Sequence, residues 1–534
     1  MQAVLNAAGW RMSAAGGILT RRSVLRSAGA AAVPLVSLAS AGCAGPGSGA
    51  LVAPGKNSTT INFTTPGAAR LADAWQPVLD MSNTTGSGVQ LHFVPIEQVA
   101  GAGAVGQAGL AALDAGGGTN AASGGANRTY RDRLVAQLAG GGAPDVVALT
   151  VFDLLALQQA GALADLSAPA KARKPAELQM DDFWPEQVDA CRVKGALYAL
   201  PWHCDALLLY FNEALFQAKA MKSPRDLLGT GKWTWQAFLE AAQRIAGPAP
   251  AGLQDAIEAQ RRAARAGRPG AAPGPGAQNG RQEAAPANGT AARAGAGALV
   301  YGTDQGAWET WVWSNGGEIL DPPMTRSLLD AIPAVEALAF MAALATQHGV
   351  APTPRELRGA NERALFDAGR MGMFFDTRNA VPRLARQVDG TWDAVPVPAG
   401  KRGAVSRLDL MVFAVTSASK TPAEAFEAAR FLTSAAAQRQ WAKRGDTIPT
   451  RRSAAGSAEF LKFAGPTQAT EKANASFVEA VQKNAVRLPP LLASWPELNQ
   501  RVTRELRPLL SGERDAGAAA RAAASALNQL LAGG

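Results

Sequence analysis

Short apolar strands that alternate with helical segments are the feature that most constrains the fold of this chain. Residues 60–64 and 89–95 alternate apolar and polar side chains, as half-buried strands do. Between them, apolar residues from 71 to 79 recur at helical spacing. Strands separated by helices predict an α/β architecture. Further predicted strands are 146–149, 196–201, 206–211, 299–302, 371–375 and 411–415, and further helices are 130–138, 154–159, 235–246, 308–315, 330–349, 421–440 and a region after 494.

Two of these helices have specific start signals. Thr234 is suited to capping a helix, and Trp233 and Phe238 flank it at the spacing of a hydrophobic staple. Thr421 precedes a proline at the first helical position, and Glu424 completes the pattern of a capping box. Both patterns predict where a helix begins.

Two stretches without an aromatic residue interrupt the pattern. Residues 100–127 are rich in Gly and Ala and are interpreted as an inserted loop. Residues 247–298 contain one Leu and one Ile, too little apolar area to offset the cost of ordering, so we predict a disordered insertion. The G-x-G-x-x-G spacing at 101–106 lies inside the first stretch and not between a strand and a helix, which argues against a dinucleotide site.

The net charge of +9 is concentrated in two places. Residues 1–42 carry four arginines and no acidic residue, and residues 251–300 carry six arginines against three acidic residues. The rest of the chain is nearly balanced. We therefore predict no nucleic-acid partner.

The N-terminus has the pattern of an export signal. Arg21 and Arg22 precede the apolar stretch 28–41, which is too short to span a bilayer as a mature helix. The arrangement resembles a twin-arginine signal, and residues 40–43 resemble a lipoprotein cleavage box with Cys43 as the acylated residue. Ser40 stands where Leu is usual, so a simple cleaved signal is the alternative, and Met12 is an equally plausible start. We predict a signal over 1–42 and a flexible tether over 43–56.

The sequence has no pattern of catalysis or metal binding. Three cysteines and three well-separated histidines form neither a disulfide scaffold nor a histidine-rich metal site, and we predict no metal and no cofactor. Cys191 and Cys204 form either a bridge or two buried thiols. Asp181 and Asp182 are interpreted as helix caps. The serine–lysine spacing at 417–420 lacks its companion motifs, and no nucleophile elbow is present, so the sequence does not indicate an enzyme.

Twelve tryptophans outnumber four tyrosines, and several stand next to polar residues near the ends of predicted elements. Flat indole rings suit stacking on the C–H faces of sugars, with carboxylates, amides or arginines bonding the hydroxyls. The alternative is that each ring packs in a core.

Several segments, in order, resemble the extracellular solute-binding proteins of bacterial ABC importers, which include sugar- and maltose-binding members. The resemblance covers about residues 57–505 and implies a two-lobed periplasmic-binding-protein fold of type II, with crossing hinge segments and the ligand between the lobes. The segments are GGAPDVVAL (141–149), LQQAGALADLS (157–167), GALYALPWHCDALLLYFNEALF (195–216), KWTWQAFLEAA (232–242), WSNGGEIL (313–320), HGVAPT (348–353), FDAGRMGMFF (366–375) and FAVTSASKTPAEAFEAARFL (413–432).

The resemblance also implies lobe boundaries. The N-terminal lobe would comprise 57–203 and 411–447, with 100–127 inserted, and the C-terminal lobe 204–410 and 448–528, with 247–298 inserted. Both insertions depart from the compact pattern of the family.

The residues that match ligand-facing positions of the family form the predicted binding site. They are Thr150 and Asp153 after one strand, Trp202 and Asp205 in the first crossing, Trp308 and Trp311 before a Gly pair, Asp376, Arg378 and Asn379 after the GMFF strand, Asp409 in the second crossing, and Trp495 after a Pro pair. A tryptophan that family members often carry after the GMFF strand is missing. A guanidinium such as that of Arg378 also suits a phosphate or carboxylate ligand.

The resemblance implies a monomeric, exported protein in the periplasm or on the outer face of the membrane, held there through lipidated Cys43. It would capture a sugar-like solute by hinge closure and deliver it to the transmembrane subunits of an ABC permease. The alternatives are a secreted carbohydrate-active enzyme, a binding protein for a phosphorylated polyol such as a glycerol phosphate, and a sensor partner without a permease. The sequence identifies neither the ligand nor the role of the insertions.

Overall fold

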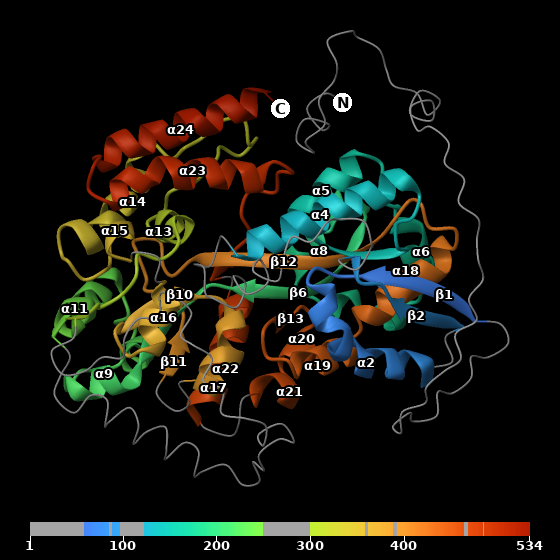
Figure 1. Ribbon diagram of the computed structural model, residues 1–534, viewed down its shortest axis with the longest axis horizontal. Helices are drawn as coiled ribbons and strands as arrows, with labels where there is room; N and C mark the ends of the chain where they lie inside the picture. The colour runs from blue at the N-terminus through green and yellow to red at the C-terminus, as the bar shows by residue number, and fades with distance from the viewer. Residues whose placement is uncertain are drawn as a thin grey trace, which may run out of the picture.

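Two β-sheets organise the chain into two lobes in the computed structural model, and two long strands cross between them (Figure 1). The N-terminal lobe, at the right of Figure 1, contains the larger sheet, and the C-terminal lobe, at the left, contains a three-stranded sheet. The residues that the structure describes are 58–84, 88–96, 122–248, 299–357, 361–387, 392–463, 468–483 and 485–533.

The N-terminal lobe is built on the sheet order β13-β6-β12-β3-β1-β2. Its strands β1, β2 and β3 are parallel, and β12 joins them antiparallel through β3. Helices α2 and α19 lie below this sheet in Figure 1, α4 and α5 lie above it, and α18 packs against its strands. The bounds are β1 Thr59–Thr64, β2 Val89–Phe93, β3 Val146–Thr150, β6 Ala199–Ala206, β12 Ser406–Val415, β13 Ile448–Pro449, α2 Ala68–Thr84, α4 Ala122–Gly140, α5 Val151–Gln159, α18 Pro422–Leu432 and α19 Ala435–Ala442.

The C-terminal lobe is built on the antiparallel sheet β10-β7-β11. Leu209, Phe211 and Phe375 on one face of this sheet pack against α11, α13 and α14, while Tyr210 on the other face packs against α22. Helices α23 and α24 pack on each other and on α14. The bounds are β7 Leu208–Asn212, β10 Met373–Asp376, β11 Trp392–Val395, α11 Trp235–Ile245, α13 Trp308–Ser314, α14 Ile332–Thr346, α22 Gln468–Gln482, α23 Trp495–Leu510 and α24 Ala516–Gly533.

The crossing strands β6 and β12 pair with each other along most of their length. β6 belongs to the large sheet and continues through Leu207 into β7 of the small sheet. β12 begins beside β14 (Val486–Arg487) and ends beside β3. Two adjacent strands therefore join the lobes, the arrangement that a hinge between rigid bodies requires.

Short elements complete the fold. They are α6 Ser167–Ala172, α7 Pro175–Leu178, η3 Met180–Asp182, α8 Pro185–Asp189, β4 Arg192–Val193, β5 Ala196–Leu197, α9 Glu213–Ala218, α10 Pro224–Gly229, β8 Gly247–Pro248, β9 Leu299–Val300, α15 Pro354–Leu357, α16 Glu362–Asp367, η4 Arg378–Ala380, α17 Val381–Gln387, α20 Arg452–Ala455 and α21 Ala458–Leu461. Among the described residues, no helix combines the length and apolarity that crossing a bilayer needs.

The predicted start of α11 is confirmed. The Thr234 hydroxyl accepts a hydrogen bond from Ala237 N at 3.3 Å, and the rings of Trp233 and Phe238 lie 6.1 Å apart. Cys191 and Cys204 are buried free thiols, which decides between the two alternatives for this pair.

Three local predictions are wrong. α18 begins at Pro422 with Thr421 as its N-cap residue, as predicted, but Thr421 makes no side-chain cap bond. The helix predicted over 421–440 is two helices, because the Ser434 hydroxyl accepts from Ala437 N and starts α19. Residues 122–127, predicted within a loop, belong to α4. Asp182 does not cap the helix that follows it, since its carboxylate accepts from the backbone N–H and hydroxyl of Ser453 in the first turn of α20.

Other predictions concern residues outside the described ranges. These are the signal, the tether, Cys43, the first part of the 100–127 insertion and nearly all of the 247–298 insertion. The described ends of the second insertion pair with each other, because Gly247 and Pro248 of β8 form an antiparallel ladder with Val300 and Leu299 of β9.

Candidate functional site at the junction of the lobes

Two aspartates face each other across the crossing strands. Asp205 of β6 and Asp409 of β12 are register partners, so their side chains lie on the same face of the ladder. Asp409 is 47% exposed, and Asp205 is half-buried. The junction thus presents two neighbouring carboxylates, which can accept hydrogen bonds from hydroxyl or ammonium donors.

Asp205 also ties the crossing strand to the C-terminal lobe. Its Oδ1 accepts a hydrogen bond from the backbone N–H of Arg378, at 2.7 Å. Burial raises the pKa of Asp205 to about 8, with a smaller raising effect from the nearby carboxylates of Asp409 and Asp376 included in that value. Asp205 therefore tends to hold a proton at neutral pH.

A second polar cluster follows β10. Arg363 of α16 donates to Asp376 Oδ1 at 2.6 Å and to Asn379 Oδ1 at 3.0 Å. Asp376 is fully buried, whereas Asn379 is exposed. Asn379 is therefore the accessible member of the cluster. Arg363 was missed in the sequence, where it lies in a short helix without a recognisable motif.

Arg378 points away from any accessible surface. It is fully buried, Nη1 donates to Asn474 Oδ1 at 2.5 Å, and its guanidinium lies 3.9 Å from the centre of the Phe460 ring. Burial lowers the pKa of Arg378 to about 10. Because the Arg378 guanidinium is enclosed, it is not accessible to a phosphate or carboxylate ligand in this structure.

The three tryptophans predicted in the C-terminal lobe are buried. Trp308 donates through Nε1 to Asn499 Oδ1 at 3.0 Å, and its ring lies 6.4 Å from that of Trp495. Trp311 donates to Gln305 O at 2.7 Å. Each ring is at most 5% exposed, so these indoles support the wall of the lobe in this conformation.

Arg407 connects this wall to the crossing strands. Its Nη2 lies 3.2 Å from Asp409 Oδ2, and its Nη1 lies 3.9 Å from Glu309 Oε1 of α13. Both Arg407 and Glu309 are buried. The guanidinium therefore orients the Asp409 carboxylate, a role that no sequence pattern indicated.

The N-terminal lobe contributes the end of β3. The Thr150 hydroxyl accepts from Asp153 N at 3.1 Å and donates to Asp153 Oδ2 at 2.8 Å, while Arg131 lies 3.7 Å from the same carboxylate. Burial raises the pKa of Asp153. Thr150 and Asp153 thus form a helix start, and Phe152 between them packs against the hydrophobic clusters of both lobes.

Trp202 does not face the junction. Its ring is 3% exposed and packs 5.4 Å from Trp75, 5.1 Å from Trp441 and 4.7 Å from Phe413. The register of β6 and β12 shifts between Met411 and Val412, and this bulge leaves Trp202 without a partner in the ladder. The predicted residues with accessible side chains are therefore Thr150, Asp205, Asn379 and Asp409.

The described residues include no group of three His, Cys, Asp or Glu side chains that could hold a metal ion. Two arginines of the junction are paired with carboxylates, in Arg407–Asp409 and Arg363–Asp376. The arrangement suits the recognition of a small polar solute by hydrogen bonds.

The family whose model matches the chain is described as "Bacterial extracellular solute-binding protein", and the match covers residues 115–464. The chain belongs to this family. Membership explains the two lobes and the crossing strands, and it implies a protein that works outside the cytoplasm.

Solved structures of solute-binding proteins share this fold. One is a cyclic α-maltosyl-1,6-maltose binding protein from Arthrobacter globiformis, at 17% identity over 89% of this chain and 100% of that chain, with a TM-score of 0.63. Another is an ABC substrate-binding protein of Listeria monocytogenes in complex with cycloalternan, at 17% identity over 88% and 98% of the two chains, with a TM-score of 0.62. The maltose-bound MalE3 of T. maritima matches at 20% identity over 88% and 99%, with a TM-score of 0.59.

A curated relative is the mannitol-binding protein of Pseudomonas aeruginosa, 30% identical over 119 residues. The match covers 22% of this chain and 25% of the relative, so the chain spans only a quarter of that protein's length.

Proposed function

We propose that this solute-binding protein captures a sugar or sugar-like polyol between its lobes and delivers it to an ABC permease. The observation that carries the proposal is the pair Asp205 and Asp409 on the strands that join the lobes. Carboxyl groups at this position can exchange hydrogen bonds with sugar hydroxyls. The named ligands of the relatives, which are cycloalternan, cyclic α-maltosyl-1,6-maltose, maltose and mannitol, are all polyhydroxylated.

Ligand capture would couple to closure of the lobes. Asp205 and Asp409 lie on the crossing strands, Thr150 belongs to the N-terminal lobe and Asn379 to the C-terminal lobe. A solute that touches all of them gains more contacts when the lobes are closed, and this difference in affinity drives the change in conformation. Lobe boundaries at 203/204 and 410/411 are part of this proposal, as are monomeric assembly, twin-arginine export and lipid anchoring through Cys43. We place the third boundary after β13 and not at 447/448, because Ile448 and Pro449 pair with β6.

The proposal assigns no catalytic step. A glycosidase requires a protonated acid and a second carboxylate on opposite sides of the scissile bond. Asp205 and Asp409 lie side by side on one ladder and not across a substrate. We expect bound oligosaccharides to be recovered intact after prolonged incubation, which chromatography of the supernatant would establish.

The test begins with a thermal-shift screen of sugars, polyols and glycerophosphodiesters, because a ligand selective for the native state raises its melting temperature. Calorimetry of the best ligand then compares Asp409→Ala with Glu479→Ala. Glu479 is a matched control because it also pairs with a basic side chain and is 45% exposed, against 47% for Asp409.

We expect Asp409→Ala to weaken binding by about ten- to a hundredfold, the equivalent of one or two charged hydrogen bonds. Glu479→Ala should leave the affinity unchanged. Equal affinities of the two variants would place the ligand elsewhere.

A further inference from the structure

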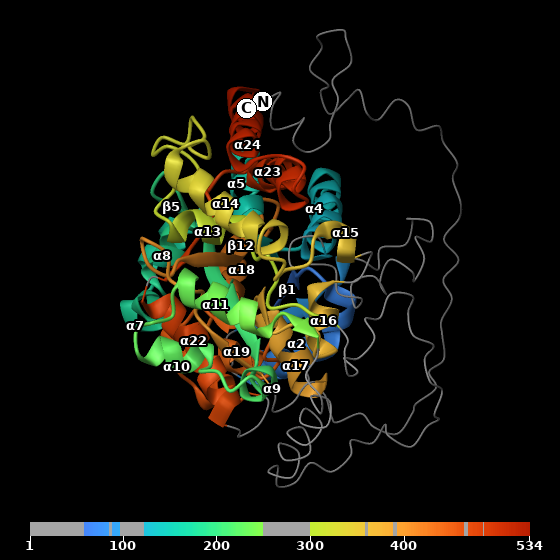
Figure 2. The ribbon, with the colours of Figure 1, turned by 90° about the vertical axis from the view of Figure 1, so that its left-hand side faces the viewer.

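A hollow of about 420 Å³ opens on the C-terminal lobe. Helix α11, which forms part of it, lies at the edge of the molecule away from the N-terminal lobe in Figure 1 and faces the viewer in Figure 2. None of its lining residues belongs to the N-terminal sheet or to β6 or β12. They are Thr234, Trp235, Gln236, Asn315, Glu336, Phe340, Ala399, Gly400 and Lys401.

Two aromatic rings form the apolar part of the hollow. Trp235 of α11 and Phe340 of α14 stack with their centres 4.6 Å apart and their planes 18° from parallel. Trp311 fixes the position of Trp235 from the side, at 5.1 Å. Both Trp235 and Phe340 remain partly exposed, so the core does not fully enclose them. Each ring uses one face for this stack, so a sugar ring would pack its C–H face on the outer face of the stack that lines the hollow.

Three polar side chains surround this surface, and their hydrogen bonds leave specific atoms available. Asn315 donates through Nδ2 to Pro333 O at 2.8 Å and to Glu336 Oε2 at 3.0 Å. Lys401 Nζ donates to the same Glu336 oxygen at 2.6 Å. An amide nitrogen has two hydrogens and an ammonium three, so Asn315 Oδ1 and Glu336 Oε1 can still accept, and Lys401 can still donate.

The frame of the hollow is rigid. Trp235 N donates to Ala399 O at 3.0 Å, and Arg402 N donates to Ser314 O at 2.8 Å, so the loop that carries Lys401 is fixed to α11 and α13. A Cβ atom on Gly400 would lie 2.5 Å from Ser314 O. Only glycine lets the loop approach α13 this closely, and the hollow is therefore formed before any ligand arrives.

We infer that this hollow is a second carbohydrate site, which binds a single pyranose ring on the aromatic pair. The hydroxyls of the ring would meet Glu336 and Asn315 as acceptors and Lys401 as a donor. Its volume falls in the usual range of about 300–1,000 Å³ for small-molecule sites. All its residues come from one lobe, so binding needs no closure, and the inference does not depend on which solute the junction binds.

The test is ligand-observed saturation-transfer NMR on the full chain with methyl α-D-glucopyranoside, a pyranoside that offers a ring face, and with mannitol, an acyclic polyol that does not. Three variants separate the sites. Phe340→Leu removes part of the aromatic surface, Lys401→Met removes the donor, and Asp409→Asn alters the junction.

Lys483→Met is the matched control for Lys401→Met. The two ion pairs are exposed to the same extent: the side chains of Lys401 and Lys483 are 68% and 69% exposed, and those of their partners Glu336 and Glu479 are 46% and 45% exposed. Circular dichroism melting of each variant shows that it is folded at the temperature of the NMR measurement.

We expect the pyranoside signal to survive in Asp409→Asn and Lys483→Met. It should weaken by about two- to tenfold in Phe340→Leu and in Lys401→Met, because each variant loses one aromatic or hydrogen-bonding contact. Mannitol should show no signal that depends on Phe340. A pyranoside signal that disappears in Asp409→Asn and is unchanged in Phe340→Leu and Lys401→Met would overturn the second site and leave the junction as the sugar site. Equal dependence of mannitol and the pyranoside on Phe340 would overturn the ring-stacking assignment.

Discussion

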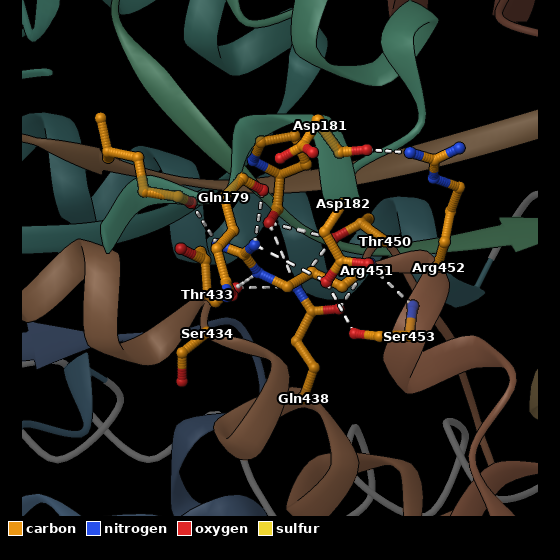
Figure 3. Close-up of polar contacts among 12 residues, drawn as sticks. Gln179, Asp181, Asp182, Thr433, Ser434, Gln438, Thr450, Arg451, Arg452 and Ser453 are labelled. Atoms are coloured by element: carbon orange, nitrogen blue, oxygen red, sulfur yellow. Dashed lines mark hydrogen bonds and ion pairs between the residues drawn. The ribbon is translucent and has the colours of Figure 1, made fainter. Parts of the chain in front are cut away.

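Arg451 offers the sharpest test of how the N-terminal lobe is held together. It follows β13 and is 3% exposed, and Figure 3 shows its guanidinium surrounded by backbone oxygens. Nε donates to Thr433 O at 2.6 Å, Nη1 to Gln179 O at 2.8 Å and Nη2 to Leu178 O at 3.1 Å. The guanidinium also lies 4.0 Å from the centre of the Phe183 ring. One side chain thus connects the loop after α7 to the end of α18.

Arg451→Met keeps an unbranched apolar stem and removes the guanidinium with its five N–H donors. Three carbonyl oxygens then lose their partner, at about 1 kcal/mol or more each, and Asp182, 3.7 Å away, loses its nearest cation. The expected loss of unfolding free energy is about 3–5 kcal/mol. The neighbouring Arg452 is exposed and bonds to Asp181 O, so Arg452→Met should cost about 0–1 kcal/mol.

Urea unfolding followed by far-UV circular dichroism measures the difference. With a slope of about 3 kcal/mol per molar urea, Arg451→Met should lower the midpoint by about 1–1.7 M, and Arg452→Met by less than about 0.3 M. Equal midpoints for the two variants would refute the argument, because the buried hydrogen bonds would then contribute no more than the exposed one.

Two further predictions concern the crossing strand β6. The folded state raises the pKa of Asp205 to about 8, so the stability that its proton provides is complete below about pH 4 and is lost as the pH rises through about 8. The melting temperature of Asp205→Asn relative to the native protein should therefore increase between pH 5 and pH 9, and a constant difference would contradict the assignment. Trp202→Ala should lower the unfolding free energy by about 3–5 kcal/mol, because its ring fills the aromatic core. Trp202→Phe should lower the unfolding free energy less and leave the ligand affinity unchanged. A folded Trp202→Phe protein that no longer binds ligand would show that Trp202 contacts the ligand.

The predicted site was only partly recoverable from the sequence. Asp205 and Asp409 were found because each lies in a segment that resembles a crossing strand, but only the structure shows that they are register partners. Arg363 and Arg407 were not found, because each acts through a carboxylate that is distant in the sequence or hidden in a strand. Trp202 and Arg378 were named as ligand contacts, yet both lie in cores.

The sequence by itself determined the α/β class, the place of most strands and helices, and the start of α11 at Thr234. These features depend on local periodicity and on hydrogen bonds within one turn, which neighbouring residues decide. Only the tertiary structure decided which side chains face the junction and which are enclosed. A single extra residue in β6 turned Trp202 out of the ladder, and the partners of Arg378 come from α21 and α22, far along the chain. The direction of a side chain in a strand depends on register and on distant packing, and neither is recorded in the local sequence.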